Sequence, residues 1–398
     1  MLFEYWWLLA LPLFFGLGWL AARIDIKELL SESRSLPESY FKGLNFLLNQ
    51  KPDEAVEALI EVVKSEAPEA IELHFTLGGL FRRRGEVERA IRMHQHLLDR
   101  PGLPREQQHA AVFELGQDYQ KAGLLDRAEA LFQDLRGTDF AEEASKRLLG
   151  IYVQEKDWAK AIDTASQLGV LSSASYHMEI AQFHCELAQQ EQAQGHAEAA
   201  CAHAEEALRV NRGCVRATIL YGDLELGRDP SAAIARWKQV EIQDPEYLHL
   251  VGGKLLEAYR AAGRTVEGLD LLRGYLSRYP SIDLLNTVFQ GVLEQEGPDP
   301  AYELVRDELR RNPTLQGLDR LLEAAQLRGD VGADRRQDMQ LVKHLIHQHT
   351  RRLAVYRCES CGFDARQFYW HCPACGGWET FPARRREEKE AVQAVAPR

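Results

Sequence analysis

Apolar residues recur along most of the chain at the spacing of amphipathic helices, and these helices come in pairs. Each first helix carries a small residue followed three positions later by an aromatic one, and each second helix carries a small residue near its middle. Two clear copies are LHFTLGGLFRRRGEVERAIRMHQHLL, from Leu73, and AAVFELGQDYQKAGLLDRAEALFQDL, from Ala110. At a period of roughly 34 residues, residues 36–350 would hold about nine units. The pattern predicts an all-α solenoid of stacked helix pairs.

Glycines occupy two kinds of position in these copies. Gly78 and Gly116 lie within first helices, where the missing side chain would let the partner helix approach closely. Gly85, Gly123 and Gly263 fall between the two helices of a pair, where a left-handed backbone is often needed. We therefore expect tight helix crossings at the first set and turns at the second.

The start of the chain follows a different pattern. From Tyr5 to Ala22 the sequence YWWLLALPLFFGLGWLAA is apolar, uncharged and without a polar face. As a helix it would span roughly 27 Å, close to the hydrocarbon thickness of a bilayer. A cleaved signal peptide is the alternative, but only Glu4 precedes the run where a basic segment is expected, and no A-x-A-like site stands out. Residues 1–22 are predicted to be a transmembrane anchor, and residues 23–35 a juxtamembrane linker.

Positive charge beside this run predicts its orientation. Arg23, Lys27 and Arg34 follow it, whereas no Lys or Arg precedes it. Lys and Arg residues that flank a membrane helix stay in the cytoplasm. The large C-terminal part is therefore expected on the cytoplasmic side.

The C-terminal region contains the sharpest motif. In YRCESCGFDARQFYWHCPACGGWETF, two C-x-x-C pairs are separated by ten residues, and a glycine follows each pair. Two such turns bring four thiolates to one point and make a tetrahedral metal site. Zinc and iron both suit four thiolates, and the metal stays open. The predicted ligands of this ribbon, residues 351–383, are Cys358, Cys361, Cys372 and Cys375.

Further expectations concern the rest of this region. The helix around Leu341 leads into the ribbon, so the ribbon is expected to dock on the last repeat. The remaining cysteines, Cys185, Cys201 and Cys214, are scattered through helical sequence, which indicates reduced, buried thiols rather than a disulfide framework. Residues 384–398 form a charged tail that is expected to be disordered.

Charge and missing motifs narrow the function classes. The formal net charge of −12 disfavours a nucleic-acid partner. No phosphate-binding loop, dinucleotide fingerprint or hydrolase motif is found in the sequence. The chain is therefore predicted to bind proteins and not to be an enzyme.

The paired helices resemble the tetratricopeptide repeat, and the cysteine segment with its aromatics Phe363, Tyr369, Trp370 and Trp378 resembles a rubredoxin-like ribbon. Resemblance to the repeat implies an extended concave face, lined by the first helix of each pair, that binds partner proteins. The candidate partner-binding residues on that face are Tyr40, Phe75, Arg82, Phe113, Gln117 and Gln120.

An N-terminal membrane helix, tetratricopeptide units and a rubredoxin-like ribbon in this order resemble the lipopolysaccharide assembly protein B family of Gram-negative bacteria. The resemblance covers essentially the whole chain. It implies a single-pass protein of the inner membrane that acts as an adaptor for the membrane protease FtsH and promotes degradation of LpxC, the deacetylase of lipid A synthesis. It also implies contacts with other inner-membrane proteins of lipopolysaccharide assembly and regulation.

Two alternatives remain open. The chain could be a scaffold that only gathers lipopolysaccharide assembly and transport proteins, with an indirect effect on the deacetylase. It could also be a redox protein that uses an iron ribbon, since rubredoxins carry iron for electron transfer.

Overall fold

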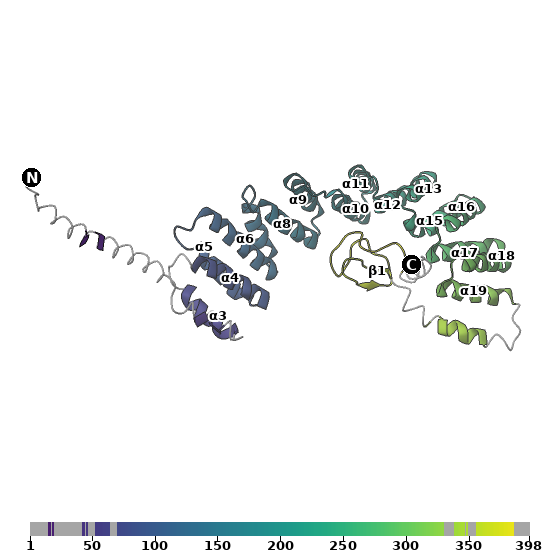
Figure 1. The fold of residues 1–398 in the computed structure, drawn as a ribbon. Coiled ribbons are helices and arrows are strands. Elements are labelled where there is room, and N and C mark those ends of the chain that lie inside the picture. Colours follow the sequence, from purple (N-terminus) through teal and green to yellow (C-terminus); the bar gives the residue numbers. More distant parts are fainter. Residues whose placement is uncertain are drawn as a thin grey trace, which may run out of the picture. The chain divides into compact units, whose positions relative to one another are not determined.

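The computed structural model describes residues 15–16, 18–19, 42–43, 45–46, 52–63, 70–329, 338–346, 348 and 356–385. In this part the chain is helical almost throughout and ends in a small two-stranded ribbon (Figure 1). It divides into two compact units, Met1–Glu155 and Lys156–Arg398. The predicted combination of a mostly helical array and a C-terminal cysteine ribbon is confirmed.

The first unit is a row of helices that pack on their neighbours in sequence order. Within the pairs, α4 packs on α5 and α6 packs on α7. Contacts between α5 and α6, and between α7 and α8, connect each pair to the next helix in the row. The first helices α4 and α6 also contact each other. The helices of this unit are α3 (Pro52–Val63), α4 (Ala70–Arg84), α5 (Val87–Leu98), α6 (Arg105–Lys121), α7 (Leu125–Asp134) and α8 (Ala141–Glu155).

The expected roles of the glycines are confirmed in this unit. A Cβ atom added to Gly116 on α6 would lie 2.6 Å from Cε1 of Phe132 on α7, so only glycine lets this ring sit against the helix. Gly85 and Gly123 have φ angles of +80° and +76°, and Gly263 in the second unit has +71°. All three end a first helix in the left-handed region that glycine adopts without strain.

The second unit continues the helix pairs. Its helices α10 and α11 are the most extensively packed pair, and α10 also contacts α9 and α12. The bounds are α9 (Trp158–Leu171), α10 (His177–Ala193), α11 (Ala197–Val210), α12 (Val215–Glu225), α13 (Pro230–Lys238), α14 (Val240–Gln243), the 3-10 helix η2 (Pro245–Tyr247), α15 (Leu248–Ala261), α16 (Thr265–Arg278), α17 (Ile282–Glu296), α18 (Pro298–Arg311) and α19 (Leu315–Arg328).

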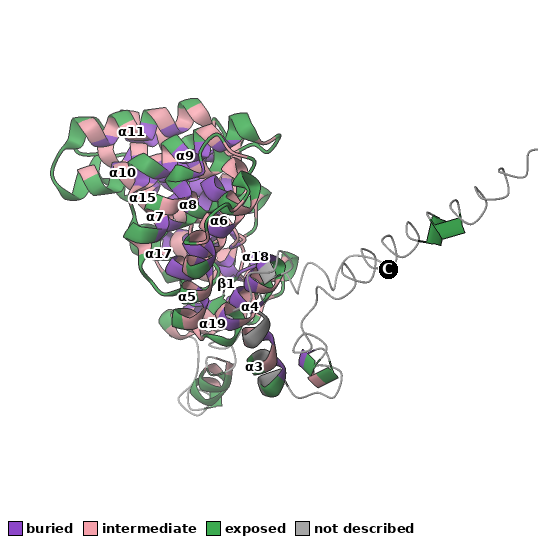
Figure 2. Cartoon of the chain, turned by 90° about the vertical axis from the view of Figure 1, so that its left-hand side faces the viewer, coloured by how far each residue is buried: buried purple, intermediate pink, exposed green. Residues whose placement is uncertain are grey.

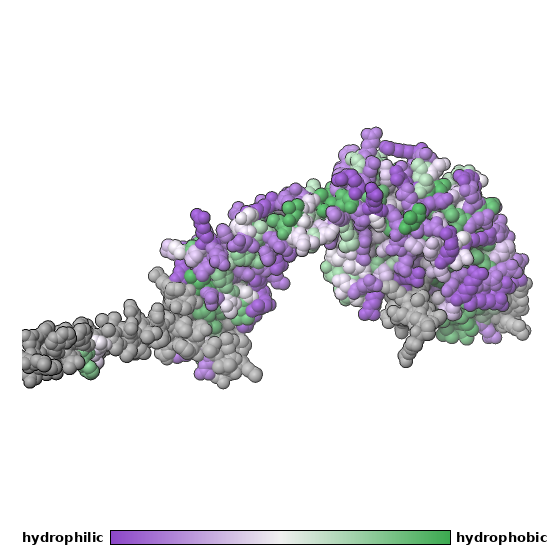
Figure 3. Space-filling view, turned by 45° about the horizontal axis from the view of Figure 1, so that its top comes forward, coloured by the Kyte–Doolittle hydropathy of each residue, from purple (hydrophilic) through white to green (hydrophobic). Residues whose placement is uncertain are grey.

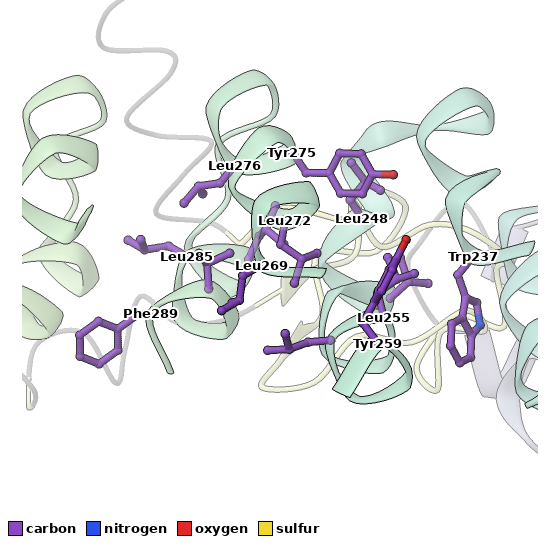
Figure 4. Packing of buried hydrophobic residues seen from close by; sticks show 14 of the residues in the cluster. Trp237, Leu248, Leu255, Tyr259, Leu269, Leu272, Tyr275, Leu276, Leu285 and Phe289 are labelled. Carbon is purple, nitrogen blue, oxygen red and sulfur yellow. The ribbon is translucent and has the colours of Figure 1, made fainter. Parts of the chain in front are cut away.

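A continuous apolar core runs through this unit from α12 to α19. Trp237, Tyr275 and Phe289 are among its largest fully buried side chains, and Figure 4 shows them with leucines of α15, α16 and α17 between them. The Trp237 indole also donates a hydrogen bond of 3.2 Å to the carbonyl oxygen of Ile219 on α12. Each pair thus covers the apolar face of the next, as expected for a repeat array.

Burial alternates around each helix. Figure 2 shows buried residues along the sides that neighbouring helices share and exposed residues on the other sides. The side chains exposed in the view of Figure 3 are mostly hydrophilic. This amphipathic pattern is the one that the spacing of apolar residues predicted.

Several predicted segments fall largely outside the described residues. They are most of the predicted anchor at residues 1–22, the linker at 23–35, Tyr40, and the tail beyond residue 385. Among the helices that can be described, none combines the length and apolar character that crossing a bilayer requires.

Candidate metal centre

The ribbon is built from two turns of the same design. In the first, the amide of Gly362 donates to the carbonyl of Cys358 (2.9 Å), and the amide of Cys358 donates to the carbonyl of Phe363 (2.9 Å). In the second, the amide of Gly376 donates to the carbonyl of Cys372 (2.9 Å), and the amide of Cys372 donates to the carbonyl of Gly377 (2.8 Å). The two glycines have φ angles of +76° and +70°. Each C-x-x-C-G segment therefore folds into a tight knuckle that only glycine closes without strain.

Short strands support these knuckles. β1 (Tyr356–Arg357) pairs antiparallel with β2 (Asp364–Ala365), so that Tyr356 faces Ala365. A single bridge between His371 and Trp378 plays the same part for the second knuckle. Two-stranded pairings of this size are not stable alone in water, so the fold of the ribbon needs another source of free energy.

The four predicted ligands meet at one point. Their sulfur atoms all lie within 4.8 Å of one another. The Sγ atoms of Cys358 and Cys375 are 3.8 Å apart, and so are those of Cys361 and Cys372. Metal–sulfur bonds of about 2.3 Å give a tetrahedron with edges of about 3.8 Å. The cluster therefore fits one metal ion with four protein ligands, and zinc and iron both satisfy this geometry.

The surroundings of Cys358 favour its thiolate form, whereas those of Cys361 favour the protonated thiol. Burial raises the pKa of Cys358, but the hydroxyl of Thr380, 3.3 Å away, and the backbone of the knuckle lower it, and the net pKa is about 6. At Cys361 a backbone hydrogen bond from Phe363 lowers the pKa, while desolvation and the neighbouring thiols raise it to about 12. Without a cation the cluster keeps protons on part of its thiols, and a bound ion would replace them.

Trp378 fixes the second knuckle to the helices of the second unit. Its indole meets Trp158 of α9 edge-on, with ring centroids 6.1 Å apart, and Phe183 of α10 at 5.9 Å. On the ribbon side, His371 stacks on the same ring at 4.1 Å. The guanidinium carbon of Arg216, on α12, lies 5.7 Å from the ring centroid. A single aromatic side chain thus joins the metal site to three helices.

Polar contacts surround this ring. Nε2 of Gln182 on α10 donates to Glu379 at 2.6 Å. Oε1 of Gln182 accepts from Arg216 at 3.1 Å, and Arg216 also pairs with Glu186 at 2.6 Å. Gln182 and Arg216 are almost fully buried. Buried polar groups of this kind are costly unless they are paired, so they specify one docked position for the ribbon.

A second group of contacts lies around η2. The ring of Tyr247 stacks on Trp370 with centroids 5.2 Å apart and meets Phe368 edge-on at 5.8 Å. Burial is the main cause that raises the pKa of Tyr247 well above its usual range. These rings bury the flank of the ribbon that Trp378 does not cover.

Asp283 at the start of α17 closes the contact. It accepts a 2.9 Å hydrogen bond from the hydroxyl of Tyr356 and a two-pronged ion pair from Arg385 at 2.8 and 2.9 Å. Arg384 lies 3.4 Å from Glu246 of η2. The first two residues of the predicted tail are therefore ordered by contacts with the helices.

The expectation that the ribbon docks on the last repeat is wrong. The ribbon lies against α9, α10, α12, η2 and α17, and Figure 1 shows it beside the row of α10, α12 and α15. Sequence reasoning noticed the ribbon aromatics but missed that they form an interface. It gave no signal for the helical partners of that interface, which are Trp158, Gln182, Phe183, Arg216, Tyr247 and Asp283.

The predicted partner-binding residues separate into two groups. Phe75 packs beside the apolar cluster of Ile71, Leu97 and Ala111, and Phe113 packs on the rings of Phe132 and Phe140. The other three described candidates line one groove of about 380 Å³ in the first unit. They are Arg82, Gln117 and Gln120.

Similar families match both parts of the chain. Residues 356–382 match the family described as a rubredoxin metal binding domain, and residues 42–93 match a tetratricopeptide repeat family. A solved tetratricopeptide repeat protein from Parabacteroides merdae aligns at 14% identity with a TM-score of 0.32, over 73% of this chain and 99% of that one.

Two relatives match over nearly the full length. The chain is 32% identical over 375 residues to Lipopolysaccharide assembly protein B of Escherichia coli strain K12. The aligned region covers 94% of this chain and 96% of that protein. It is 30% identical over 388 residues to the protein of the same name from Haemophilus influenzae strain Rd, again over 94% and 96% of the two chains.

Proposed function

The chain belongs to the lipopolysaccharide assembly protein B family, and from this premise we propose that it is a non-enzymatic adaptor in lipopolysaccharide assembly at the inner membrane. In this proposal the apolar run from Tyr5 to Ala22 anchors the chain, and the helical units face the cytoplasm. The adaptor brings the deacetylase LpxC to the membrane protease FtsH and so sets the level of the deacetylase.

The observation that carries the proposal is the docking of a closed metal ribbon on the helices. The four cysteine sulfurs would supply all four ligands of a tetrahedral ion, which would leave no position open for a substrate. The ribbon is instead held by aromatic and charged contacts through Trp378, Glu379 and Arg385. Such an ion stabilises a protein surface, which suits a binding function.

A tether explains how an adaptor without chemistry can speed degradation. An anchor that pairs with the protease and a helical array that holds the client make their encounter intramolecular. The effective concentration of the client at the protease then rises without any new catalytic group. Repeat arrays suit this task because they offer an extended surface rather than an enclosed pocket.

The test is the lifetime of the deacetylase in cells that carry the intact chain or a chain without residues 1–22. We expect the deacetylase to be degraded several-fold more slowly with the truncated chain at equal abundance. A pull-down of the intact protein in mild detergent should recover the protease and the deacetylase together. Recovery of transport components alone, with an unchanged lifetime, would favour the scaffold over the adaptor.

A further inference from the structure

A basic groove crosses the first unit on its first helices. It is formed by side chains of α4, α6 and α8, is open to solvent and has a volume of about 380 Å³. Four of its six lining side chains are cationic and the other two are primary amides. This composition is unusual in a chain with a formal net charge of −12. The lining residues are Arg82, Arg83, Gln117, Gln120, Lys121 and Arg147.

Arg82 belongs to the frame of this groove. Its guanidinium donates to the fully buried Asp118 at 2.9 Å and to Glu114 at 2.5 Å, and both acids lie on α6. The other carboxylate oxygen of Asp118 contacts Nδ1 of His94, which is buried on α5. These partly buried contacts connect α4, α5 and α6 and compensate the charge of Arg82.

The other three cations face solvent without compensation. Arg83, Lys121 and Arg147 are exposed, and within the described part of the chain none of them forms an ion pair. Arg147 makes one hydrogen bond of 3.1 Å, to the amide oxygen of Gln117. Most of its N–H groups are therefore still available. Glu114, one of the two acids that bind Arg82, also accepts a hydrogen bond from Gln117.

The geometry points to this groove as the docking site for an extended acidic segment of a partner protein, a proposal that rests on the adaptor function. Side-chain carboxylates of the segment would bind Arg83, Lys121 and Arg147, because guanidinium and ammonium groups form charge-assisted hydrogen bonds with carboxylates. Gln117 and Gln120 offer both a donor and an acceptor, as the peptide backbone of an extended segment requires.

Two other anionic partners fit less well. A bilayer presents its phosphates in a plane, whereas these cations line a hollow between three helices. A single-stranded nucleic acid would need aromatic rings for its bases, and no aromatic residue is among those that line the groove. A peptide with spaced carboxylates satisfies both the shape and the chemistry.

The test measures binding of a fluorescein-labelled peptide with three glutamates spaced by alanines to the full-length protein in neutral detergent micelles. The variant Arg83→Gln/Lys121→Gln/Arg147→Gln should bind about tenfold more weakly or worse. A peptide with glutamines in place of the glutamates should lose affinity to the same extent. Binding by the wild-type protein should also weaken as salt screens the charges.

A matched variant changes the net charge equally at residues that do not line the groove. Arg136, Lys238 and Arg311 are exposed, and Arg136→Gln/Lys238→Gln/Arg311→Gln should keep wild-type affinity for the glutamate peptide. Equal losses in both variants, or no loss in the groove variant, would overturn the proposal. Metal content and thermal unfolding of the groove variant should match the wild type, since the three side chains are exposed.

Competition separates a peptide from a lipid. Phosphatidylglycerol added to the micelles should displace the peptide no better than a neutral lipid does, and stronger displacement would assign the groove to lipid headgroups and overturn the proposal. The lifetime of the deacetylase is measured separately. If the lifetime of the deacetylase is the same with and without this protein, the adaptor function is rejected, but the measured peptide affinity is unaffected. Failure of the adaptor function and failure of the groove proposal are therefore distinguishable.

Discussion

Trp378 of the ribbon meets Phe183 of α10 edge-on, with 5.9 Å between the ring centroids and 77° between the ring planes. Trp378 follows the last metal ligand, Cys375, by three positions, whereas Phe183 lies in a helix far earlier in the chain. The indole is only 8% exposed. The metal site and the helical array are therefore joined by a buried aromatic contact, in addition to the polar contacts around it.

Replacing this indole tests the contact. Trp378→Ala removes a buried ring and should cost the docked state about 3–5 kcal/mol. The four cysteines stay in place, so the metal content should remain one ion per chain. Hydrogen exchange is the measurement, and we expect amides of residues 356–385 and of α10 to exchange faster than in the wild type.

Phe363→Ala is the matched control for this variant. Phe363 also belongs to the ribbon but is 39% exposed, and among the described residues it makes no aromatic ring contact with the helices. The hydrogen-exchange pattern of the Phe363→Ala variant should stay close to that of the wild type. If Trp378→Ala left exchange in α10 unchanged, the aromatic contact would not be what holds the ribbon.

Removal of the metal should release the whole ribbon. Its two-residue strands cannot hold the knuckles without the ion, so metal binding supplies the folding free energy. Cys358→Ser/Cys361→Ser, or treatment with a strong chelator, should expose Trp370 and Trp378 and shift tryptophan emission to longer wavelength. The same double variant should lengthen the lifetime of the deacetylase.

Cys201→Ser controls for the loss of a thiol. Cys201 is half-buried on α11, outside the cluster of four sulfurs, so this variant should keep the metal and the emission of the wild type. Metal analysis and a visible spectrum of the purified protein also separate zinc from iron, because an iron centre with four thiolates is coloured. Full function in a metal-free variant would remove the ribbon from the mechanism.

Glu379 is expected to make the stability of the docked state depend on pH. Burial is the main cause that raises its pKa above the ordinary 4.5, and Glu179 and Asp244 add to this, while Gln182 and Arg216 oppose it. A carboxyl with a raised folded-state pKa binds its proton more tightly when folded. The contribution of Glu379 to the free energy of unfolding is therefore most favourable at low pH. This contribution is lost as the pH rises from the ordinary pKa through the raised one.

Glu379→Gln removes this titration and keeps an acceptor for Gln182. We expect the variant to be more stable than the wild type at neutral pH, with a difference that shrinks as the pH falls through the raised pKa of Glu379 and vanishes below the ordinary pKa of glutamate. Thermal unfolding across pH 4–8 measures it. Glu198→Gln, at an exposed position of α11, should show no such trend, and an identical trend in both variants would contradict the assignment.

Local signals predicted the parts of this molecule, but not how they dock. The four cysteines could be identified because a C-x-x-C-G knuckle is a short segment whose geometry depends on its own residues. The helix pairs could be identified because burial repeats along each helix. The bond between Gln182 and Glu379 joins residues 197 positions apart, and Gln182 belongs to no motif. Such a contact depends on the finished curvature of the array, which no local pattern encodes.

Two of the helical glycines, Gly116 and Gly150, test the packing argument, because alanine is expected to destabilise the protein at one and stabilise it at the other. Gly116→Ala places a methyl group 2.6 Å from a ring carbon of Phe132, so the ring or the helix must move, at a cost of about 1–3 kcal/mol. Gly150 lies on the exposed side of α8 with no atom within 4 Å of an added Cβ. Gly150→Ala should therefore stabilise the unit by about 0.5–1 kcal/mol, because alanine loses less backbone entropy in a helix. Chemical denaturation of both variants measures the difference, and stabilisation by Gly116→Ala would show that the crossing of α6 and α7 can open without penalty.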